Sequence, residues 1–491
     1  MLVDYLKGQI IARFGLNPTP QQRGLIDALA EFLLPGGERP CSGRPVFILR
    51  GFAGTGKTSL VSALVRVMAQ SRLKCVLMAP TGRAAKVFSH YSGCTAYTIH
   101  KRIYRFDFDT SGGQHYTIDF NKTKDTLFIV DEASMIDLGS GVLHDLVTYV
   151  FSGSGCRLIL MGDTAQLPPV GSSESPALMD SVIGSMGLDV TSFTLTDVVR
   201  QSDRSGILTN ATHLRGLLPD GESPCRVRGG GPGGGLPRIE FGDDTVNLPG
   251  NELIEAISDS YDRCGMGQTA IVCRSNKRAN IYNRGIRSQI LGYEEELEQG
   301  DILMIAKNNY YWLDKNYPPL PSDKAAEPDG GRSGVGLLSF LANGDVAVVE
   351  RVCREHELYG FRFAECDLCL PDYDDLRLTA TVMLDTLHAE APSLTAEQNE
   401  LLFTRVMEDY ADIPSKKERL KRLREDAHFN ALQVKYAYAV TCHKAQGGQW
   451  RDVFIDQGYV APEMIGREYY RWLYTAFTRA TERVYLVNWP G

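Results

Sequence analysis

The sequence predicts an α/β protein with two parallel-sheet units, a β-hairpin inserted in the first unit, and a small β-barrel plus helices inserted in the second. Three observations support this fold class. Short apolar runs recur along the chain, and each ends in a polar loop that leads into a helical pattern. One of those loops has the glycine spacing GFAGTGKT. The length of 491 residues exceeds what a single hydrophobic core usually holds.

Composition limits the class of protein without indicating a partner. Hydrophobic residues make up 43% of the chain and charged residues 23%, as in ordinary globular proteins. The net charge of −8 excludes a protein that is basic all over, but it allows a local basic groove. The 11 cysteines are scattered, and Cys366 and Cys369 form a CxxC without a second pair, so we expect reduced thiols and no structural metal. No run approaches the roughly 20 apolar residues that span a bilayer, and we expect a cytoplasmic protein with no membrane partner.

The glycine loop is the strongest signal for a nucleotide site. It follows the apolar run 46–49 and opens a helical pattern at 59–65. Glycines let successive N–H groups converge on an anion, and the helix dipole adds positive potential there. We expect a phosphate site at the loop, with Lys57 on the β- and γ-phosphates and the Thr58 hydroxyl on Mg²⁺, flanked by Gly54, Thr55, Gly56 and Ser59. An ordinary strand–helix turn is the disfavoured alternative.

A capped helix precedes this loop. Thr19 is a plausible N-cap with Pro20 at the first helical position. Upstream of a phosphate loop, the Gln22 amide could bind both edges of an adenine. A simple capped surface helix explains the same residues equally well.

Acidic and amide side chains follow two later apolar strands. The run 127–130 ends in Asp131 and Glu132, which would hold Mg²⁺ and activate water, respectively. The run 158–161 leads to Gln166, which could sense the γ-phosphate. Because parallel strands end at the same edge of a sheet, these groups should meet the phosphate loop. Arg200 could act as an arginine finger or form a surface salt bridge.

The rest of the first unit contains one strand and one hairpin signal. The strand 75–79 ends at Pro80-Thr81-Gly82-Arg83-Ala84-Ala85-Lys86, and a short Thr-Ile-His-Lys segment follows at 98–101. Two alternating arms flank Ser-Gly-Gly at 111–113, which predicts a β-hairpin over 104–120.

A composition change at the glycine-rich segment 229–235 precedes the second unit. We expect its sheet strands at 269–273, 300–305, 436–440, 453–455 and 484–487, and helices at 276–291 and from about 463 to 480. The alternation over 335–370, with a tight turn at 343–345, predicts an inserted antiparallel barrel. Residues 392–430 are predicted helical, and the basic run 415–424 either faces water, which we favour, or meets phosphates.

The order of these motifs resembles that of superfamily 1 helicases. The series is Gln22, GFAGTGKT, APTGRAAK, TIHK, DEAS, GDTAQLPPVG, VVRQ, VTCHKAQG and YTAFTRA. The short first insertion and the NGD-containing barrel favour the RecD-like and Dda-like branch, superfamily 1B. The resemblance implies RecA-like domains at 36–196, with a pin at 103–122, and at 197–317 with 431–491. It also implies N-terminal helices at 1–35 and an inserted barrel and helical domain at 318–430.

The resemblance also implies roles for particular residues. Lys57, Thr58, Asp131 and Glu132 would bind and hydrolyse ATP with Mg²⁺, Gln22 would recognise adenine, and Gln166, Arg200 and Arg479 would complete the site across the cleft. Pro80, Thr81, His100, Thr441 and His443 resemble residues that contact the DNA strand. Phe106, Phe108 or Tyr116 would be the wedge of the pin, although a plain hairpin core explains each of these aromatics equally well.

The expected function is therefore an ATP-dependent DNA helicase that moves along single-stranded DNA and opens single-strand/duplex junctions. A 5′-to-3′ direction is implied by the family alone. We expect a monomer that could work with other repair or replication proteins. Two alternatives stay open: an ATP-binding subunit of a recombination nuclease complex, and an RNA helicase.

Overall fold

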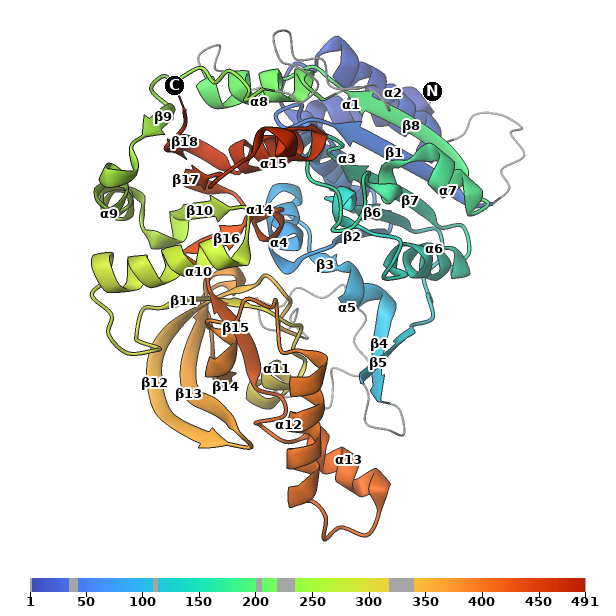
Figure 1. Cartoon of the computed structure of the whole chain (residues 1–491). Helices are drawn as coiled ribbons and strands as arrows, with labels where there is room; N and C mark the ends of the chain where they lie inside the picture. Colours follow the sequence, from blue (N-terminus) through green and yellow to red (C-terminus); the bar gives the residue numbers. More distant parts are fainter. Residues whose placement is uncertain are drawn as a thin grey trace.

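Two parallel sheets and a closed barrel form the framework of the protein (Figure 1). The structure, a computed structural model, describes residues 2–34, 43–108, 114–199, 205–218, 235–317 and 340–490. In these ranges no helix combines the length and the apolar character needed to cross a lipid bilayer.

The first lobe comprises residues 2–34 and 43–199 and holds a six-stranded parallel sheet in the order β3-β2-β6-β7-β1-β8. Its strands are β1 (Pro45–Gly51), β2 (Cys75–Ala79), β3 (Ala96–Thr98), β6 (Leu127–Val130), β7 (Arg157–Gly162) and β8 (Asp189–Leu195). Its helices are α1 (Leu2–Phe14), α2 (Pro20–Leu33), α3 (Lys57–Gln70), α4 (Gly82–Ser92), α5 (Ile99–Ile103), α6 (Val142–Ser152) and α7 (Asp180–Ser185).

The sheet of the first lobe is covered by helices on both faces. Alternate residues of β1 enter different cores: Phe47 and Leu49 pack with residues of α2 and α3, whereas Val46 and Ile48 pack with residues of α6. A strand that is buried on both faces has a continuous apolar sequence, and for this reason the sequence predicts β1 well.

The predicted hairpin is present as β4 (Tyr104–Phe108) paired antiparallel with β5 (Gln114–Ile118). We call this hairpin the pin, and it extends away from the first lobe toward the lower end of the molecule in Figure 1. Its Ser-Gly-Gly loop lies outside the described residues, as do the side chains of Phe106, Phe108 and Tyr116.

The second lobe comprises residues 205–218, 235–300 and 437–490 and has a five-stranded parallel sheet in the order β16-β10-β17-β18-β9. The strands are β9 (Thr245–Leu248), β10 (Thr269–Cys273), β16 (Ala439–Thr441), β17 (Trp450–Asp456) and β18 (Ala480–Val487). The helices are α8 (Gly206–Gly216), α9 (Leu253–Cys264), α10 (Asn276–Gly285), which continues as a π-helix to Ile290, α14 (Cys442–Ala445) and α15 (Arg467–Phe477).

The barrel is larger than the alternation over 335–370 predicts. It is closed by β11 (Ile302–Ile305), β12 (Val346–Leu358), β13 (Phe361–Leu370), β14 (Leu376–Met383) and β15 (Leu432–Tyr436). The predicted turn at 343–345 is present, with Asp345 N donating to Ala342 O at 3.0 Å and Gly344 at φ 95°.

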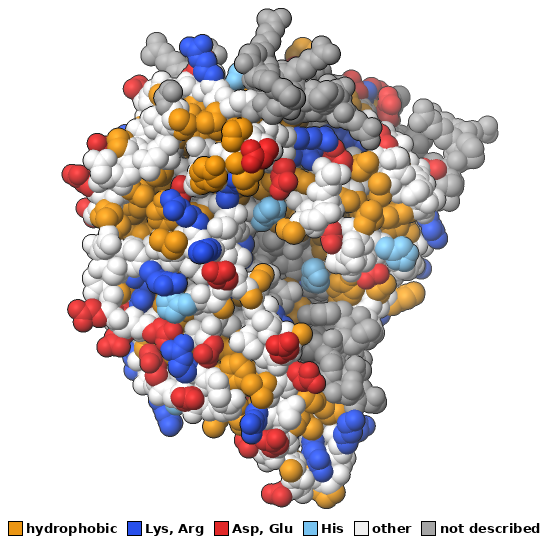
Figure 2. Space-filling model, viewed as in Figure 1, with side chains coloured by type: hydrophobic (Ala, Val, Ile, Leu, Met, Phe, Trp, Pro, Cys, Tyr) orange, Lys and Arg blue, Asp and Glu red, His pale blue; other side chains and the backbone are white. Residues whose placement is uncertain are grey.

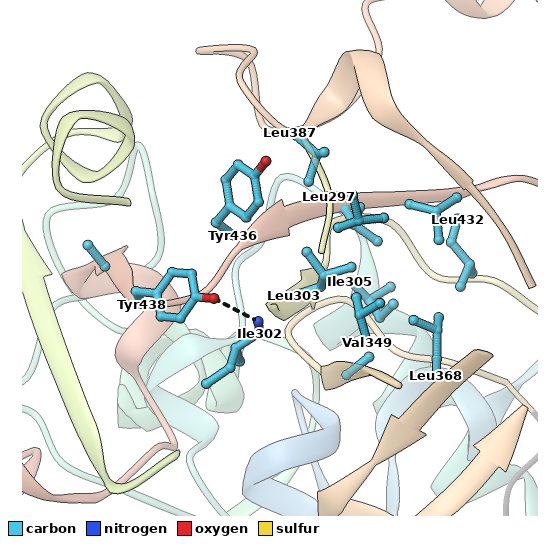
Figure 3. Close-up of a cluster of buried hydrophobic side chains, with 14 of the residues drawn as sticks. Leu297, Ile302, Leu303, Ile305, Val349, Leu368, Leu387, Leu432, Tyr436 and Tyr438 are labelled. Atoms are coloured by element: carbon cyan, nitrogen blue, oxygen red, sulfur yellow. Dashed lines mark hydrogen bonds between the residues drawn. The ribbon is translucent and has the colours of Figure 1, made fainter. Parts of the chain in front are cut away.

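Two strand predictions for the second sheet are wrong. The segment 300–305 forms β11 of the barrel, and the segment 436–440 is divided between β15 of the barrel and β16 of the sheet. A short apolar run does not specify whether its strand pairs in the sheet or in the barrel, because both bury such strands. Figure 3 shows the junction: Tyr438 lies beside Ile302, whose N–H donates to the Tyr438 hydroxyl at 3.3 Å.

Helices predicted over 392–430 are also present. They are α12 (Ala396–Asp409) and α13 (Lys416–Arg424), and together we call them the arm. The arm packs on the barrel and ends at the lower tip of the molecule in Figure 1, while α11 (Tyr311–Asn316) lies beside β14.

Candidate functional site

A cavity of about 380 Å³ lies between the two lobes. Residues from both lobes line it, including residues of the loops that follow β1, β6 and β7 and residues just after α15. The predicted residues that the structure brings together here are Gln22, Gly54, Gly56, Lys57, Thr58, Ser59, Asp131, Glu132, Gln166 and Arg479. Thr55, in the same loop, is buried.

The phosphate loop adopts the backbone that its glycines predict. Gly54 and Gly56 have φ of 79° and 84°, in the left-handed region that favours glycine. The Lys57 ammonium donates to the carbonyl oxygens of Gly51 and, at 3.1 Å, of Phe52. These carbonyls hold the cation at the start of α3, where an incoming phosphate would also meet the helix dipole.

Gln22 connects the first helix pair to this loop. Its Nε2 donates to Thr55 O at 3.0 Å, and its Oε1 accepts from Thr19 N at 3.1 Å in a capping box. A Cβ at position 56 would lie 2.7 Å from Gln22 Nε2, so only glycine fits beside the amide. The amide keeps one donor hydrogen and one lone pair for a ligand, and its role toward adenine stays a prediction.

The acidic pair lies opposite the loop. Thr58 Oγ1 and Asp131 Oδ2 are 3.4 Å apart, and Glu132 N donates to Asp131 Oδ1 at 2.7 Å. Glu132 has φ 52°, a left-handed conformation that this hydrogen bond helps to hold. Burial, together with the neighbouring Glu132, raises the pKa of Asp131 to about 7. A hydroxyl and a buried carboxylate are the oxygen donors that Mg²⁺ prefers, so these two residues fit the predicted metal.

Arg479, just after α15, and Gln166, in the loop after β7, also line the cavity. Arg479 is buried and donates to Thr475 O at 3.0 Å, Thr478 Oγ1 at 3.1 Å and Gly448 O at 3.4 Å. Gln166 is also buried, and its Oε1 has no hydrogen-bond partner within the described ranges. Arg200 lies outside the described residues.

Hydrogen bonds that the sequence does not reveal join the lobes beside the cavity. The Tyr474 hydroxyl of α15 donates to Asp163 Oδ2 at 2.7 Å and accepts from Ala53 N in the phosphate loop at 2.9 Å. Leu167 N donates to Thr475 Oγ1 at 2.9 Å, and Gln446 Nε2 donates to Leu167 O at 2.8 Å. The loops after β1 and β7 are therefore attached directly to the second lobe.

Sequence reasoning also missed part of the cavity wall. Helix α8, which carries no recognisable motif, contributes Ile207, Leu208 and Ala211, and the segment between α1 and α2 contributes Leu16. The Arg215 guanidinium lies 4.4 Å from the centre of the Phe52 ring, and Arg83 lies 3.9 Å from the Trp450 ring. No pattern in the sequence pairs these residues, because they are far apart along the chain.

The residues predicted to contact a nucleic-acid strand follow three sheet strands. Pro80 and Thr81 follow β2, and His100 follows its neighbour β3, so they share one edge of the first sheet. Thr81 caps α4 by accepting from Ala84 N at 3.2 Å.

On the second lobe, Thr441 ends β16 and His443 lies in α14. The loop that follows touches the first lobe, because a Cβ at Gly447 would lie 3.4 Å from Thr81 Oγ1. Burial lowers the pKa of His100 and of His443, which keeps both rings neutral at pH 7.

A second cavity of about 410 Å³ lies beside that edge, between the first lobe and the barrel. Lys86 donates to Pro371 O at 3.0 Å and lies 3.7 Å from Asp372, so α4 contacts the barrel directly. Lys101 lines the same cavity, and burial lowers its pKa to about 8. The cavity therefore places ammonium groups next to the predicted strand-contact residues.

Two family models match the chain. Residues 39–219 match an AAA domain, and residues 436–487 match the UvrD-like helicase C-terminal domain. These ranges contain the phosphate loop, the acidic pair and the Arg479 motif.

Known relatives match parts of this chain. The chain is 32% identical over 214 residues to the ATP-dependent RecD2 DNA helicase of Deinococcus radiodurans, covering 44% of this chain and 25% of the relative. It is 26% identical over 264 residues to the ATP-dependent DNA helicase dda of Enterobacteria phage T4, covering 52% and 55%. The chain thus spans only part of the length of these relatives.

Among solved structures, the Pif1 helicase from Candida albicans aligns over 97% of this chain and 95% of its own, with 16% identity and a TM-score of 0.44. The two matched domains and these relatives make the chain similar to helicases of superfamily 1B, in the RecD-like and Dda-like branch.

Proposed function

We propose that this chain is an ATP-dependent DNA helicase that moves along single-stranded DNA, in the 5′-to-3′ direction, and separates the duplex at a single-strand/duplex junction. One observation carries the proposal. The inter-lobe cavity combines the phosphate loop and acidic pair of the first lobe with Arg479 of the second lobe. A nucleotide bound there would contact both lobes at once.

Hydrolysis follows from the positions of these groups. Lys57 would leave its carbonyl partners for the β- and γ-phosphates, and Thr58 with Asp131 would hold Mg²⁺, which neutralises phosphate charge when bound. Glu132 would orient the attacking water and accept its proton. Arg479 and Arg200 would stabilise charge on the transferring phosphoryl group. Gln166 would contact the γ-phosphate and couple its presence to movement of the lobes. Gln22 would position the adenine.

Movement would come from the hydrogen bonds between the lobes. Tyr474 contacts both Ala53 of the phosphate loop and Asp163 at the end of β7. A change in the loop on phosphate binding or release would therefore alter how α15 sits on the first lobe. Repeated closing and opening of the lobes would advance a strand that both lobes grip.

The strand would lie across Pro80, Thr81 and His100 on the first lobe and Thr441 and His443 on the second. Thr81 lies next to Gly447, so the two groups are continuous across the lobes. The pin would meet the duplex where the strands part, with Phe106 or Phe108 as the wedge. The substrate would be a forked or tailed duplex.

The proposal is tested by steady-state ATP hydrolysis with and without oligonucleotides. Single-stranded DNA should stimulate hydrolysis, and Lys57→Ala should abolish it. Glu132→Gln should bind ATP but lower kcat about 10²- to 10⁴-fold, the usual contribution of a general base. Glu31→Gln, at an exposed position of α2, is the matched control and should behave as the wild type.

Each alternative has its own outcome in the same assay. Stimulation by RNA but not by DNA would mean that the substrate is RNA, while the assignment of ATP hydrolysis would stand. Failure of any nucleic acid to stimulate hydrolysis would contradict the proposal.

A further inference from the structure

Positive charge is concentrated in one helix of an acidic chain. The net charge of the whole sequence is −8. Helix α13 nevertheless carries six basic side chains and one acidic side chain, Glu418, within nine residues, a net charge of +5. The basic residues are Lys416, Lys417, Arg419, Lys421, Arg422 and Arg424. Such a local excess of one sign attracts a polyanion.

The helix is a rigid support for these charges. Leu420 and Leu423 are buried against Leu402 and Val406 of α12 and against Phe363 of the barrel. Arg419 donates to Ile413 O, and the Tyr410 hydroxyl donates to Asp426 Oδ2 at 3.0 Å. The arm is therefore packed on the barrel, which fixes the position of the helix backbone that carries these charges.

One flank of the helix is a basic stripe. Lys417, Lys421 and Arg424 lie at positions i, i+4 and i+7, which share a face of an α-helix. The stripe spans about 10 Å along the helix axis, at 1.5 Å per residue. DNA carries one phosphate per about 3.4 Å along each strand, so about three phosphates fit this length.

Acidic residues of the arm do not neutralise the lysines. Helix α12 carries Glu397, Glu400, Glu408 and Asp409, but Glu408 pairs with Arg405 and Asp409 accepts from Tyr359. On α13 itself, Arg422 pairs with Glu425 at 4.0 Å. Within the described ranges, Lys417 and Lys421 are exposed and have no ion-pair partner.

The arm and the pin reach the same end of the molecule. In Figure 1 both extend toward the lower end, away from the inter-lobe cavity. Figure 2 shows Lys and Arg side chains at the lower tip, with acidic side chains beside them. A duplex that meets the pin would arrive at this end.

We propose that Lys417 and Lys421 of this stripe contact the phosphate backbone of duplex DNA ahead of the pin. The inference rests on the proposed function, because that function brings a duplex to the pin. Lysine and arginine contacts to phosphates carry no sequence information, so the stripe would orient any duplex. It would thereby favour a single-strand/duplex junction over single-stranded DNA.

Salt dependence of binding tests this contact directly. Fluorescence anisotropy would follow binding of a 5′-tailed duplex, and of the tail alone as single-stranded DNA, from low to high salt. Each phosphate contact to B-DNA contributes about 0.9 to the slope of log K against log salt. Lys417→Ala/Lys421→Ala should therefore reduce the slope for the tailed duplex by about 2 and leave the single-strand slope unchanged.

The matched control removes the same charge elsewhere. Lys74→Ala/Lys124→Ala changes two exposed lysines that precede β2 and β6, at the opposite ends of those strands from the site. This control should keep the wild-type slope for both ligands. Thermal melting of all variants would verify folding.

The remaining outcomes overturn the inference. An unchanged duplex slope in Lys417→Ala/Lys421→Ala would mean that the stripe meets no DNA and serves another partner or solvent. An equal loss for both ligands would assign the stripe to the single strand. Failure of the proposed function is distinguishable, because it would appear as wild-type ATP hydrolysis that DNA does not stimulate.

Discussion

Tyr474 of α15 donates a hydrogen bond to Asp163 of the first lobe, with Oη and Oδ2 2.7 Å apart. The same hydroxyl accepts the Ala53 amide of the phosphate loop at 2.9 Å. Burial raises the pKa of Tyr474 well above its ordinary value, so the phenol stays protonated and remains a donor. One side chain of the second lobe thus joins two loops of the first lobe at the predicted nucleotide site.

Tyr474→Phe removes both hydrogen bonds and keeps the ring. The buried Asp163 carboxylate and the Ala53 amide lose a partner, which should cost about 1–3 kcal/mol of stability. We also expect weaker stimulation of ATP hydrolysis by DNA, because the loops are no longer tied to α15. Tyr469→Phe is the control, since its hydroxyl bonds Gln457 within the second lobe. Equal stimulation in both variants would show that Tyr474 has only a structural role.

Arg479→Ala should lower kcat for ATP hydrolysis about 10³-fold or more, the usual effect of losing an arginine that stabilises phosphoryl charge. The KM for ATP should change less, because this interaction strengthens in the transition state. Arg479→Lys keeps the charge but loses the planar donor set, and it should also be impaired. A lowered melting temperature with unchanged kcat would assign Arg479 to the hydrogen bonds it makes with Thr475, Thr478 and Gly448.

Gly82→Ala tests the contact between α4 and the barrel. A Cβ at this position would meet Asp345 Oδ1 and lie 2.8 Å from the Tyr373 hydroxyl. We expect a loss of about 1–3 kcal/mol from overpacking, measured by chemical denaturation. Gly285→Ala, at a helical glycine with no atom within 4 Å of an added Cβ, should be neutral or stabilising. Equal stability of the two variants would mean that the barrel moves freely away from α4.

Asp345 should make stability depend on pH. The carboxyl is buried, and burial raises its pKa to about 7, although the Ala342 amide and the Tyr373 hydroxyl partly offset this. The folded protein therefore holds this proton more tightly than the unfolded chain, and its contribution to stability is lost as pH rises from about 4 through 7. We therefore compare the melting temperatures of Asp345→Asn and the wild type at two pH values. The difference should be a few degrees more in favour of the variant at pH 8 than at pH 4.

Asp374→Asn is the control for this pH dependence, since Asp374 is exposed in the adjacent loop. Its melting temperature should follow that of the wild type at every pH. Parallel pH profiles for Asp345→Asn and the wild type would contradict the raised pKa.

The sequence predicts well those features that a short stretch of chain determines. The phosphate loop, Asp131, Glu132 and Gln166 follow buried strands, and parallel strands end at one edge, so their meeting could be expected. The Ser-Gly-Gly turn predicts the pin, and the periodicity over 392–430 predicts α12 and α13. Each of these signals lies within a short stretch of chain.

The sequence predicts poorly what long-range packing determines. Strands β11 and β15 join the barrel although about 130 residues separate them, because Leu303 pairs with Tyr436. An apolar run does not determine which strand it pairs with. The contacts of Tyr474 with Ala53 and of Arg83 with Trp450 depend likewise on how the lobes pack, and no motif records them.

Unwinding of tailed duplexes tests the central claim most directly. The substrates are duplexes with a 5′ tail, a 3′ tail or no tail, incubated with ATP and Mg²⁺, with Lys57→Ala as the inactive control. We predict that the wild type separates the 5′-tailed duplex in preference to the other two and that Lys57→Ala separates none. Hydrolysis of ATP stimulated by single-stranded DNA, without separation of any tailed duplex, would contradict the claim that this chain is by itself a helicase.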